Sequence, residues 1–521
     1  MASEPFISYN PSVLEKKEKE AESSSTKKAY SENENNEALL RKKSSSISKS
    51  AYRKKKSSTI IVNVAAGLDG CDDQLLPSSF RALEVELNFH PAMLGQITLV
   101  QTLCLSIGSP IWGYLSDKHS RKWILTCGAF VWGAATIGLA WVSDISQVML
   151  LRALNGFALG CVGPISQSIL ADTTNETNLG FAFGLVQLSA CIGRLLGGVV
   201  TTSVAFLPVG NILAWRLCFL VVGCLSICLS LVAAVFMSEA PRPRQVKATM
   251  IPSENGLRDV SKLGYFEQFK VFVSESLLVP SVIVVTAEGL LGTIPWSAFS
   301  FNTMYFQYCG MSDVQAAFIT GSLLVGAAFG GVIGGRLGDI MHKWSKNYGR
   351  PLIGQMAIFG RVPLVILAYT FIPKHSDYFL AYFVVALLIG LSSIAGIAVN
   401  RPILADVVRP DQRGKVFSII VAAEGSVAAL LGAPLVGILA ETFFGYRQTT
   451  QPIDEMEFGI RNGNAVALAQ ALQYQTAIPW AISFFLYGLL HFTYGHDLRK
   501  MKEIVEEEFE AISQNSESSE E

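Results

Sequence analysis

The stretch GYLSDKHSRK, residues 113–122, separates two apolar segments that are each long enough to cross a membrane. The stretch GRLGDIMHKWSKNYGR, residues 335–350, separates two further apolar segments much later in the chain. Both stretches contain Gly-x-Leu-x-Asp followed by basic residues. A second repeat is the tetrapeptide ILAD at 169–172 and 403–406, and each copy is followed by a glycine at the same distance. These repeats indicate two halves of similar construction.

Apolar segments of about 20 residues, the length needed to cross a bilayer, recur throughout residues 59–495. None alternates with the period of a strand. The polar link 239–276 divides them into six and six, and a second long link, 442–474, precedes the last. We therefore predict an all-α polytopic membrane protein with twelve transmembrane helices in two six-helix halves. The expected spans are 59–80, 93–115, 122–142, 146–171, 179–207, 214–237, 277–302, 312–336, 352–373, 378–406, 414–441 and 475–495.

The composition agrees with this prediction and argues against several other classes of protein. Of 521 residues, 50% are hydrophobic and 16% are charged, whereas soluble domains carry about 25% charged residues. The net charge of −1 offers no basic field for nucleic acid. The nine cysteines include no CxxC pair and the histidines are isolated, so we predict no metal and no cofactor. A nucleotide-binding loop of the form GxxxxGK[ST] is absent, which argues against ATP-driven pumping.

The polar segments suggest five regions and an orientation. We expect a disordered cytoplasmic tail at 1–58, one half at 59–238, a cytoplasmic link at 239–276, the other half at 277–495 and an acidic cytoplasmic tail at 496–521. The basic, serine-rich residues 41–56 could alternatively contact anionic lipids until they are phosphorylated.

Loops that carry basic residues are usually cytoplasmic. With both termini inside, the inner loops hold Lys118, Arg121 and Lys122; Arg242, Arg244, Lys247, Arg258 and Lys262; Lys343, Lys346 and Arg350; Arg409, Arg413 and Lys415; and Arg499, Lys500 and Lys502. The outer exceptions are Lys374, Arg447 and Arg461. We therefore predict an integral multi-pass membrane protein whose termini are both cytoplasmic.

The chain resembles the major facilitator superfamily over about residues 59–495. Residues 113–122 look like its loop signature between helices 2 and 3, and Arg152-x-x-Asn155-Gly156 looks like its helix-4 motif. Within the superfamily the sequence is most similar to the Spinster-like branch and related plant and protist members. The residues that carry this likeness are Asp69, Leu76-Pro77, Arg152-x-x-Asn155-Gly156, Ile169-x-x-Asp172 and Pro295-Trp296-Ser297.

The resemblance implies alternating access between the two halves, with a lysolipid-like or sphingolipid-like substrate. It also implies a substrate site between the halves near the middle of the membrane. The branch often has an acidic–Arg pair early in helix 1, whereas Asp69 is followed by Gly70 here.

Charged residues at the inner helix ends suggest a gate. Asp117 could accept hydrogen bonds from the N–H groups that begin the eleventh span near Arg413, and Arg121 could pair with Asp172. Asp339, Arg350 and Asp406 repeat this arrangement in the second half. The alternative role for these residues is only to orient the protein and shape its loops. The candidate gating residues are Gly113, Asp117, Arg121, Lys122, Arg152, Asp172, Gly335, Asp339, Arg350, Asp406 and Arg413.

Ionisable residues in the middle of spans are costly and mark solute or ion pathways. The candidates for contact with substrate or a coupling ion are Asp69, Asp72, Asp73, Arg194, Glu288, Arg401 and Glu424. Two neighbouring carboxylates suit proton carriage, but Asp69 or Asp72 could instead form a permanent structural bridge with Arg194. Arg194 could also bind an anionic head group.

Two further arginines have alternative roles. Arg401 is either a second anion contact or part of the gate near Asp406. Arg361, in the ninth span, either extends its side chain toward the inner surface or pairs with another residue.

These features predict a monomeric secondary transporter, a symporter or uniporter, that moves a small organic or amphiphilic solute by alternating access. Its expected partners are the solute, protons and membrane lipids. A carrier of a polar organic anion is the alternative, followed by a non-transporting membrane sensor of the same fold. A membrane-embedded enzyme is disfavoured because the spans contain no nucleophile–base set and no His/Glu metal pair.

Overall fold

The structure, a computed structural model, describes residues 57–173, 179–210, 212–237, 250–253, 256–259, 267, 270, 272–393, 399–409 and 412–520. Residues 1–56 of the predicted tail and most of the link 239–276 lie outside the described residues. All four residues of the first ILAD repeat are described as helix, but the side chains of Ala171 and Asp172 are outside the description.

The first half begins with a helix over 57–87, which we call helix 1. Two helices that form one span meet near Gly160 and Pro164, where a glycine and a proline favour a break. A two-stranded antiparallel hairpin precedes the last helix. After helix 1, the elements are α2 (Pro91–Lys118), α3 (Arg121–Leu139), α4 (Ile145–Leu159), α5 (Val162–Thr173), α6 (Leu179–Val204), β1 (Pro208–Val209), β2 (Ile212–Leu213) and α7 (Ala214–Phe236).

The second half repeats the arrangement after a hairpin of β3 (Met250–Ser253) and β4 (Gly256–Asp259). The eleventh predicted span of the chain, which lies in this half, is broken at Gly432, just before Pro434. The helices are α9 (Pro280–Ala298), α10 (Asn302–Tyr308), α11 (Asp313–Trp344), α12 (Gly349–Ile366), α13 (Phe379–Leu391), α14 (Arg401–Val407), α15 (Arg413–Leu431), α16 (Ala433–Ile438) and α17 (Phe458–Glu520). Single turns of 3-10 or π-helix extend several of these elements at Val273–Leu277, Phe299–Phe301, Leu367–Phe371, Ser376–Tyr378, Leu439–Phe443 and Ile453–Glu455.

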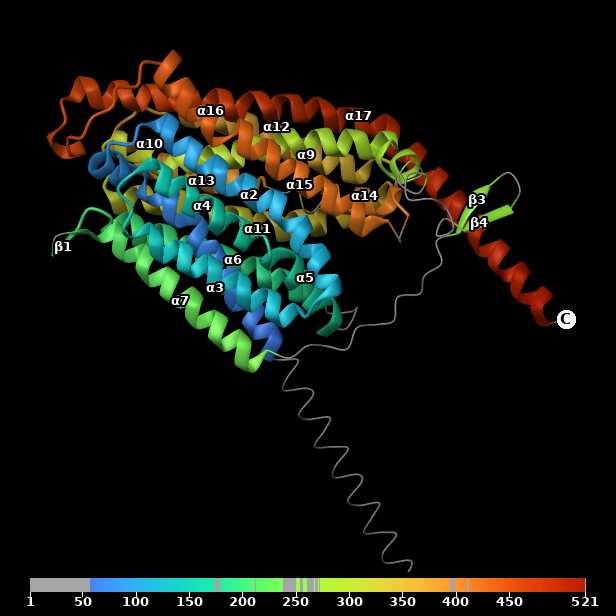
Figure 1. Ribbon diagram of the computed structural model, residues 1–521. Helices are drawn as coiled ribbons and strands as arrows, with labels where there is room; N and C mark the ends of the chain where they lie inside the picture. Colours follow the sequence, from blue (N-terminus) through green and yellow to red (C-terminus); the bar gives the residue numbers. More distant parts are fainter. Residues whose placement is uncertain are drawn as a thin grey trace, which may run out of the picture.

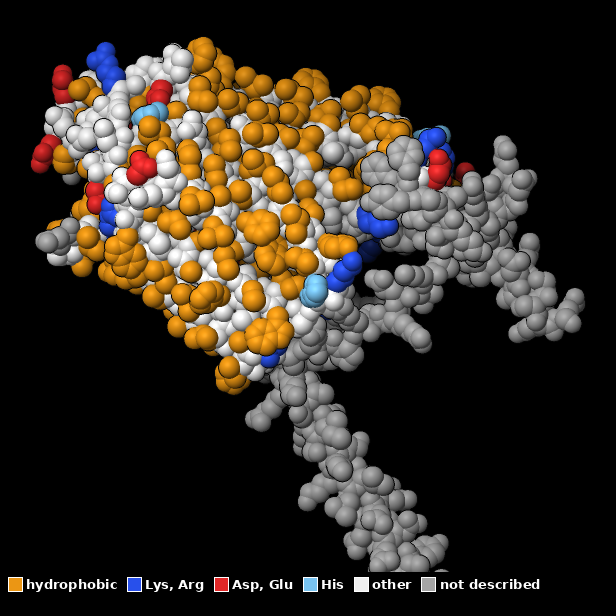
Figure 2. Space-filling view, in the orientation of Figure 1, with side chains coloured by type: hydrophobic (Ala, Val, Ile, Leu, Met, Phe, Trp, Pro, Cys, Tyr) orange, Lys and Arg blue, Asp and Glu red, His pale blue; other side chains and the backbone are white. Residues whose placement is uncertain are grey.

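In the described part of the chain, ten helices are long and apolar enough to cross a membrane. Helix 1, which carries three aspartates, and α13 and α14 lie where the other two spans are predicted, which is consistent with two six-helix halves. The predicted all-α polytopic fold is confirmed. Figure 2 shows hydrophobic side chains over the face of the bundle and charged side chains gathered at its ends.

Several predicted boundaries were wrong. Helix 1 continues to residue 87 rather than ending at 80, and α11 continues to Trp344 rather than ending at 336. The last helix, α17, runs over Phe458–Glu520 rather than 475–495. The link 442–474 is therefore partly helical. Ala465, Leu468 and Leu472 recur at helical spacing and are buried, so this polar-looking segment has a packed face that was not recognised.

We call the end of the bundle at which α2 meets α3 the inner end, and the opposite end, where helix 1 finishes, the outer end. The halves meet along two seams, where α2 packs against α15 and α16, and α6 packs against α11. In Figure 1 the long helices of both halves run side by side, and α17 continues beyond the bundle toward the C-terminus.

Helix 1 and α6 approach each other closely at Gly193. A Cβ atom placed on Gly193 would lie only 1.8 Å from the carbonyl oxygen of Gly67. Because the obstacle is backbone, a larger residue must push the helices apart. Gly193 thus sets the distance between two helices that both carry candidate site residues.

We expect Gly193→Ala to lower the free energy of unfolding by about 1–3 kcal/mol, the usual cost of overpacking. Thermal or denaturant unfolding in detergent measures this loss. Gly184→Ala on the same helix is the matched control, because a Cβ atom there meets nothing within 4 Å. Equal effects of the two substitutions would contradict the close-approach argument.

Candidate substrate and coupling site

Adjacent aspartates on helix 1 have different surroundings. Asp73 pairs with Arg194 of α6, with 3.0 Å between the Oδ2 and Nε atoms, and the side chain of Asp73 is 57% exposed. Asp72 is fully buried. Consecutive helical residues point about 100° apart, so one position faces the space between the halves while the next faces the interior of the first half.

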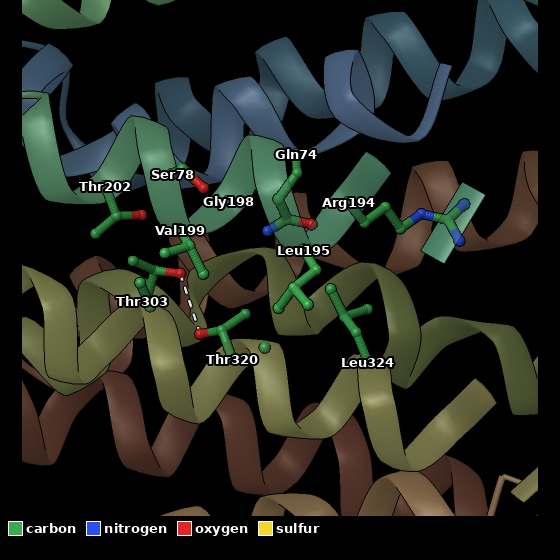
Figure 3. Close-up of a pocket in the computed structure, with 12 residues that line it drawn as sticks. Gln74, Ser78, Arg194, Leu195, Gly198, Val199, Thr202, Thr303, Thr320 and Leu324 are labelled. Atoms are coloured by element: carbon green, nitrogen blue, oxygen red, sulfur yellow. Dashed lines mark hydrogen bonds between the residues drawn. The ribbon is translucent and has the colours of Figure 1, made fainter. Parts of the chain in front are cut away.

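The Arg194 side chain lines a narrow cavity between the halves (Figure 3). Helix 1 contributes Gln74 and Ser78 to this cavity, and the other half contributes residues of α10 and α11. The cavity volume is about 10 Å³, roughly the room that one water molecule needs. In this conformation the cavity is therefore nearly closed, and the halves must separate before a ligand of ordinary size can enter.

The cavity wall is rich in hydroxyl groups. Thr303 and Thr320, both from the second half, lie 3.2 Å apart between their Oγ1 atoms. The Oγ of Ser78 and the Oγ1 of Thr202 are buried and have no hydrogen-bond partner among the described residues. A buried polar group without a partner is costly, and these two atoms belong to residues that line the same cavity. They could bind the polar part of a ligand.

Asp72 lies at the centre of a polar cluster inside the first half. It accepts hydrogen bonds from Thr136 of α3 at 2.7 Å and Asn155 of α4 at 3.2 Å. The Nη1 of Arg152 is 3.6 Å from its Oδ2, and both side chains are fully buried. The spacing Arg152-x-x-Asn155 places both side chains on one face of α4, so the helix-4 motif serves to surround Asp72.

Two sequence predictions require correction here. Arg152 was expected among the gating residues, but it lies only seven residues after Ile145, the outer end of α4, and is buried beside Asp72 rather than placed at a helix end. The alternative of a structural bridge between Asp72 and Arg194 does not hold, because Asp72 meets Arg152 and the ion pair of Arg194 is with Asp73. Asp69 is half-buried one helical turn from Asp73, and the charge of Arg194 acts on it.

A second polar cluster surrounds Glu288 in the other half. Glu288 of α9 is buried and accepts a hydrogen bond from Asn400, which in turn accepts one from the Tyr487 hydroxyl at 2.5 Å. Arg361 is also buried, close enough for its charge to act on Glu288. Each half therefore encloses a carboxylate, an asparagine and an arginine.

The structure also gives Arg361 a place that the sequence did not. Its guanidinium donates to the Oγ of Ser392 at 3.0 Å and to the Ser392 carbonyl. It lies 4.5 Å from the ring centre of Trp480, within cation–π range. Arg361 thus joins α12, the end of α13 and α17.

Arg401 and Glu424 lie near each other in the second half. The Arg401 guanidinium stacks on Phe417 at 5.4 Å, and its charge acts on Glu424. Glu424 lies directly against the backbone of α9, because a Cβ atom on Gly289 would be 2.1 Å from its Oε1. The described residues show no contact between Arg401 and Asp406, so the part of Arg401 in a gate stays a prediction.

At the inner end, the structure brings some predicted gating residues together. Arg350 forms an ion pair with Asp406, and the Tyr494 hydroxyl donates to the same carboxylate. This group fastens α12, α14 and α17 within one half. Arg121 donates to the carbonyl of Ser168 at 3.4 Å, and Arg413 donates to the carbonyl of Val408 at 3.2 Å.

The remaining gating candidates have few described contacts. Lys122 lies 5.8 Å from the ring of Trp123, and Asp339 is exposed. A Cβ on Gly113 would touch only Pro164 at 3.8 Å, and one on Gly335 would touch nothing within 4 Å. The side chains of Asp117 and Asp172 lie outside the described residues. An inner gate built from these residues therefore stays a prediction.

The sequence reasoning missed a group at the outer end. Arg81 and Glu84 of helix 1 are buried against Tyr308 and Tyr446 of the second half. The missed signal is the spacing Arg81-x-x-Glu84, which suits an ion pair on one helix face. It fell just beyond the predicted end of the first span at residue 80.

The sequence profile of the Major Facilitator Superfamily matches residues 62–359 and 310–450. The chain belongs to this superfamily. The resemblance drawn from the loop and helix-4 motifs is therefore confirmed.

Among curated relatives, the chain is 28% identical to Protein spinster homolog 3 of Mus musculus, over 64% of the chain and 65% of the relative. It is 23% identical to the 4-hydroxybenzoate transporter PcaK of Pseudomonas aeruginosa, over 54% of the chain and 64% of that relative. The matched stretch thus spans slightly less than two thirds of these relatives' own lengths. Their names describe a spinster homologue and a transporter, not enzymes.

Solved structures show the same fold. A bacterial homologue of the human lysosomal transporter Spinster, in an inward-facing and unoccupied conformation, superposes with a TM-score of 0.69 at 17% identity. That likeness covers 85% of this chain and 98% of the other. A D-xylose–proton symporter superposes with a TM-score of 0.58 at 16% identity, over 80% of this chain and 97% of the other.

Proposed function

We propose that this protein is a secondary transporter that moves an amphiphilic organic solute with an anionic or zwitterionic head group by alternating access. The observation that supports this most is the exposed Asp73–Arg194 pair beside a hydroxyl-lined cavity between the halves. A guanidinium suits phosphate or carboxylate, while Asp73 suits a cationic part of the same head group. The similarity to a spinster homologue supports a lysolipid-like solute.

We propose proton coupling through the buried carboxylates. Asp72 in one half and Glu288 in the other each have an arginine and an asparagine nearby. A carboxylate that takes up a proton changes the charge of such a cluster, and this change can shift the balance between two conformations. Protonation would thereby link a proton gradient to the movement of the halves.

A polar organic anion is the second candidate substrate. The cavity lining supports it, because six of the lining residues carry a hydroxyl, an amide or the Arg194 guanidinium, against four apolar side chains, Leu195, Val199, Ala317 and Leu324. The relative named as a 4-hydroxybenzoate transporter also carries a small aromatic acid. We further propose that the inner end is cytoplasmic, because Lys118, Lys122 and Lys343 lie there.

Uptake by purified protein in lipid vesicles tests the proposal. Radiolabelled lysophospholipid and, separately, labelled 4-hydroxybenzoate are supplied with and without an imposed proton gradient. We expect one of them to accumulate, and the gradient to drive accumulation in the wild type but not in Asp72→Asn or Glu288→Gln. Lys374→Gln, in an outer loop, is the control, and we expect its gradient-driven accumulation of solute to match that of the wild type.

Each result bears on a separate part of the proposal. Accumulation of the aromatic acid alone would replace the amphiphile with the polar anion. Unchanged gradient dependence in both carboxylate variants would exclude coupling through these clusters. Failure of the folded protein to move either solute would contradict the proposed substrate class.

A further inference from the structure

Arg81 and Glu84 form an ion pair within one helix at the outer end. The Arg81 Nη1 and Glu84 Oε2 atoms are 2.7 Å apart, and both side chains are almost completely buried. The residues are one helical turn apart and belong to the first half. They therefore move together whenever helix 1 moves.

All other contacts of this pair shown by the structure reach the second half. Arg81 donates to the backbone carbonyls of Thr449, at 2.9 Å, and Gln451. Glu84 accepts hydrogen bonds from the hydroxyls of Tyr308, at 3.1 Å, and Tyr446, at 2.6 Å. The Arg81 guanidinium also lies 5.2 Å from the centre of the Tyr308 ring.

The hydroxyl oxygens of the two tyrosines also lie 2.7 Å apart, so two hydroxyl protons are shared among three short contacts, two to Glu84 and one between the tyrosines. Burial, with the nearby charge of Glu84, raises the pKa of Tyr446 well above its ordinary value. Tyr446 lies beyond the end of its span and remains a neutral hydrogen-bond donor. The second half thus offers the ion pair only neutral hydroxyls and carbonyls.

A more exposed set of contacts surrounds this group. The Glu441 carboxylate accepts a hydrogen bond from the backbone N–H of Ala92 at 2.8 Å and lies 2.9 Å from the Nδ1 of His90. Gln448 donates to the side chain and the backbone carbonyl of Asn88 at 2.9 Å. These contacts also cross between the halves, so the outer end is joined at its rim and in its interior.

We propose that Arg81, Glu84, Tyr308 and Tyr446 form an outer latch, which holds the outer end shut and releases the intact Arg81–Glu84 pair when the halves separate. An ion pair between the halves would leave two unpaired charges on opening, which is costly. Here the charges stay paired on helix 1, and water can replace the neutral partners. The latch is therefore strong enough to close the outer end and remains easy to reverse.

The test measures the separation of the outer ends and needs no substrate. Spin labels are attached at Ser143→Cys and Asp377→Cys, exposed positions on opposite halves, after replacement of the exposed Cys127, Cys224 and Cys228. In the double variant Tyr308→Phe/Tyr446→Phe, two hydroxyls that hold Glu84 are lost. We expect the population with a long separation to rise about fivefold or more.

The matched control is Tyr305→Phe. Tyr305 is also buried on α10, but its hydroxyl bonds to Tyr382 of the same half at 2.8 Å. We expect no change in the distance distribution for this variant. Glu84→Gln is a second latch variant, and we expect it to shift the distribution in the same direction as the tyrosine pair.

An unchanged distance distribution in the tyrosine pair variant would overturn the latch. An equal shift in the Tyr305→Phe control would do the same, because it would indicate a general loosening of the outer end. Neither result bears on the substrate or on proton coupling. The latch and the proposed function can therefore fail separately.

Discussion

Replacing Arg194 with glutamine should reduce uptake of the transported solute by at least about 30-fold. The substitution removes the charge pair that we propose between the Arg194 guanidinium and the head group of the bound solute, and losing one partner of such a pair costs about 2 kcal/mol or more. The substitution removes the one guanidinium that lines the cavity between the halves. Initial rates in vesicles at several solute concentrations measure the loss. We expect Arg194→Lys to recover only part of the rate, because lysine lacks the planar, bidentate donor.

The same substitution should leave stability nearly unchanged. Its partner Asp73 is 57% exposed, and exposed ion pairs contribute only about 0–1 kcal/mol. Arg336→Gln is the matched control, since Arg336 is an exposed arginine of α11 outside the cavity. If Arg194→Gln transported at the wild-type rate, Arg194 would have no role in binding solute.

Replacing Asp72 with asparagine should, unlike the Arg194 substitution, strongly reduce stability. We expect a loss of about 3–5 kcal/mol in the free energy of unfolding. The substitution leaves the Arg152 guanidinium fully buried without a negative charge beside it. None of its nitrogen atoms has a hydrogen-bond partner among the described residues, so the ion pair with Asp72 is what compensates its charge. Arginine cannot lose its proton to relieve this cost. Denaturant unfolding in detergent measures the change.

Removing the arginine of the pair instead of the aspartate should cost less stability. In Arg152→Met the carboxyl group of Asp72 can take up a proton, and it keeps its hydrogen bonds to Thr136 and Asn155. We expect the double variant Asp72→Asn/Arg152→Met to be more stable than Asp72→Asn alone, because neither charge is then buried. A stable Asp72→Asn protein would show that the pair is not structural, and a simultaneous loss of gradient dependence would leave proton carriage as its role.

The two aspartates illustrate what can be predicted from one sequence. The cost of placing carboxylates in hydrocarbon singles out Asp72 and Asp73 without any structure. Their partners could not be assigned in this way, because Arg152 and Arg194 are both arginines on later spans and lie far away in the chain. Only the packing of helix 1 against α4 and α6 decides which carboxylate meets which arginine.

The outer end shows a similar limit. Tyr308 and Tyr446 lie in segments that look like ordinary aromatic helix ends, and Arg81 and Glu84 follow the predicted first span. These partners are far apart in the sequence, since Tyr308 lies 224 residues after Glu84. Hydrophobic periodicity reports the local conformation of a segment, but it carries no information on such pairings.

The amino-acid sequence by itself determined that the chain forms two halves of membrane-spanning helices, since apolar length and the repeated loop motif depend only on neighbouring residues. It also determined which charges had to be functionally or structurally special, because the cost of burying a charge depends on residue type and depth. The tertiary structure alone decided which of these charges is locked inside a half, which faces the cavity, and which closes the outer end. Those distinctions depend on the angle at which each side chain leaves its helix and on the distant helix that it meets.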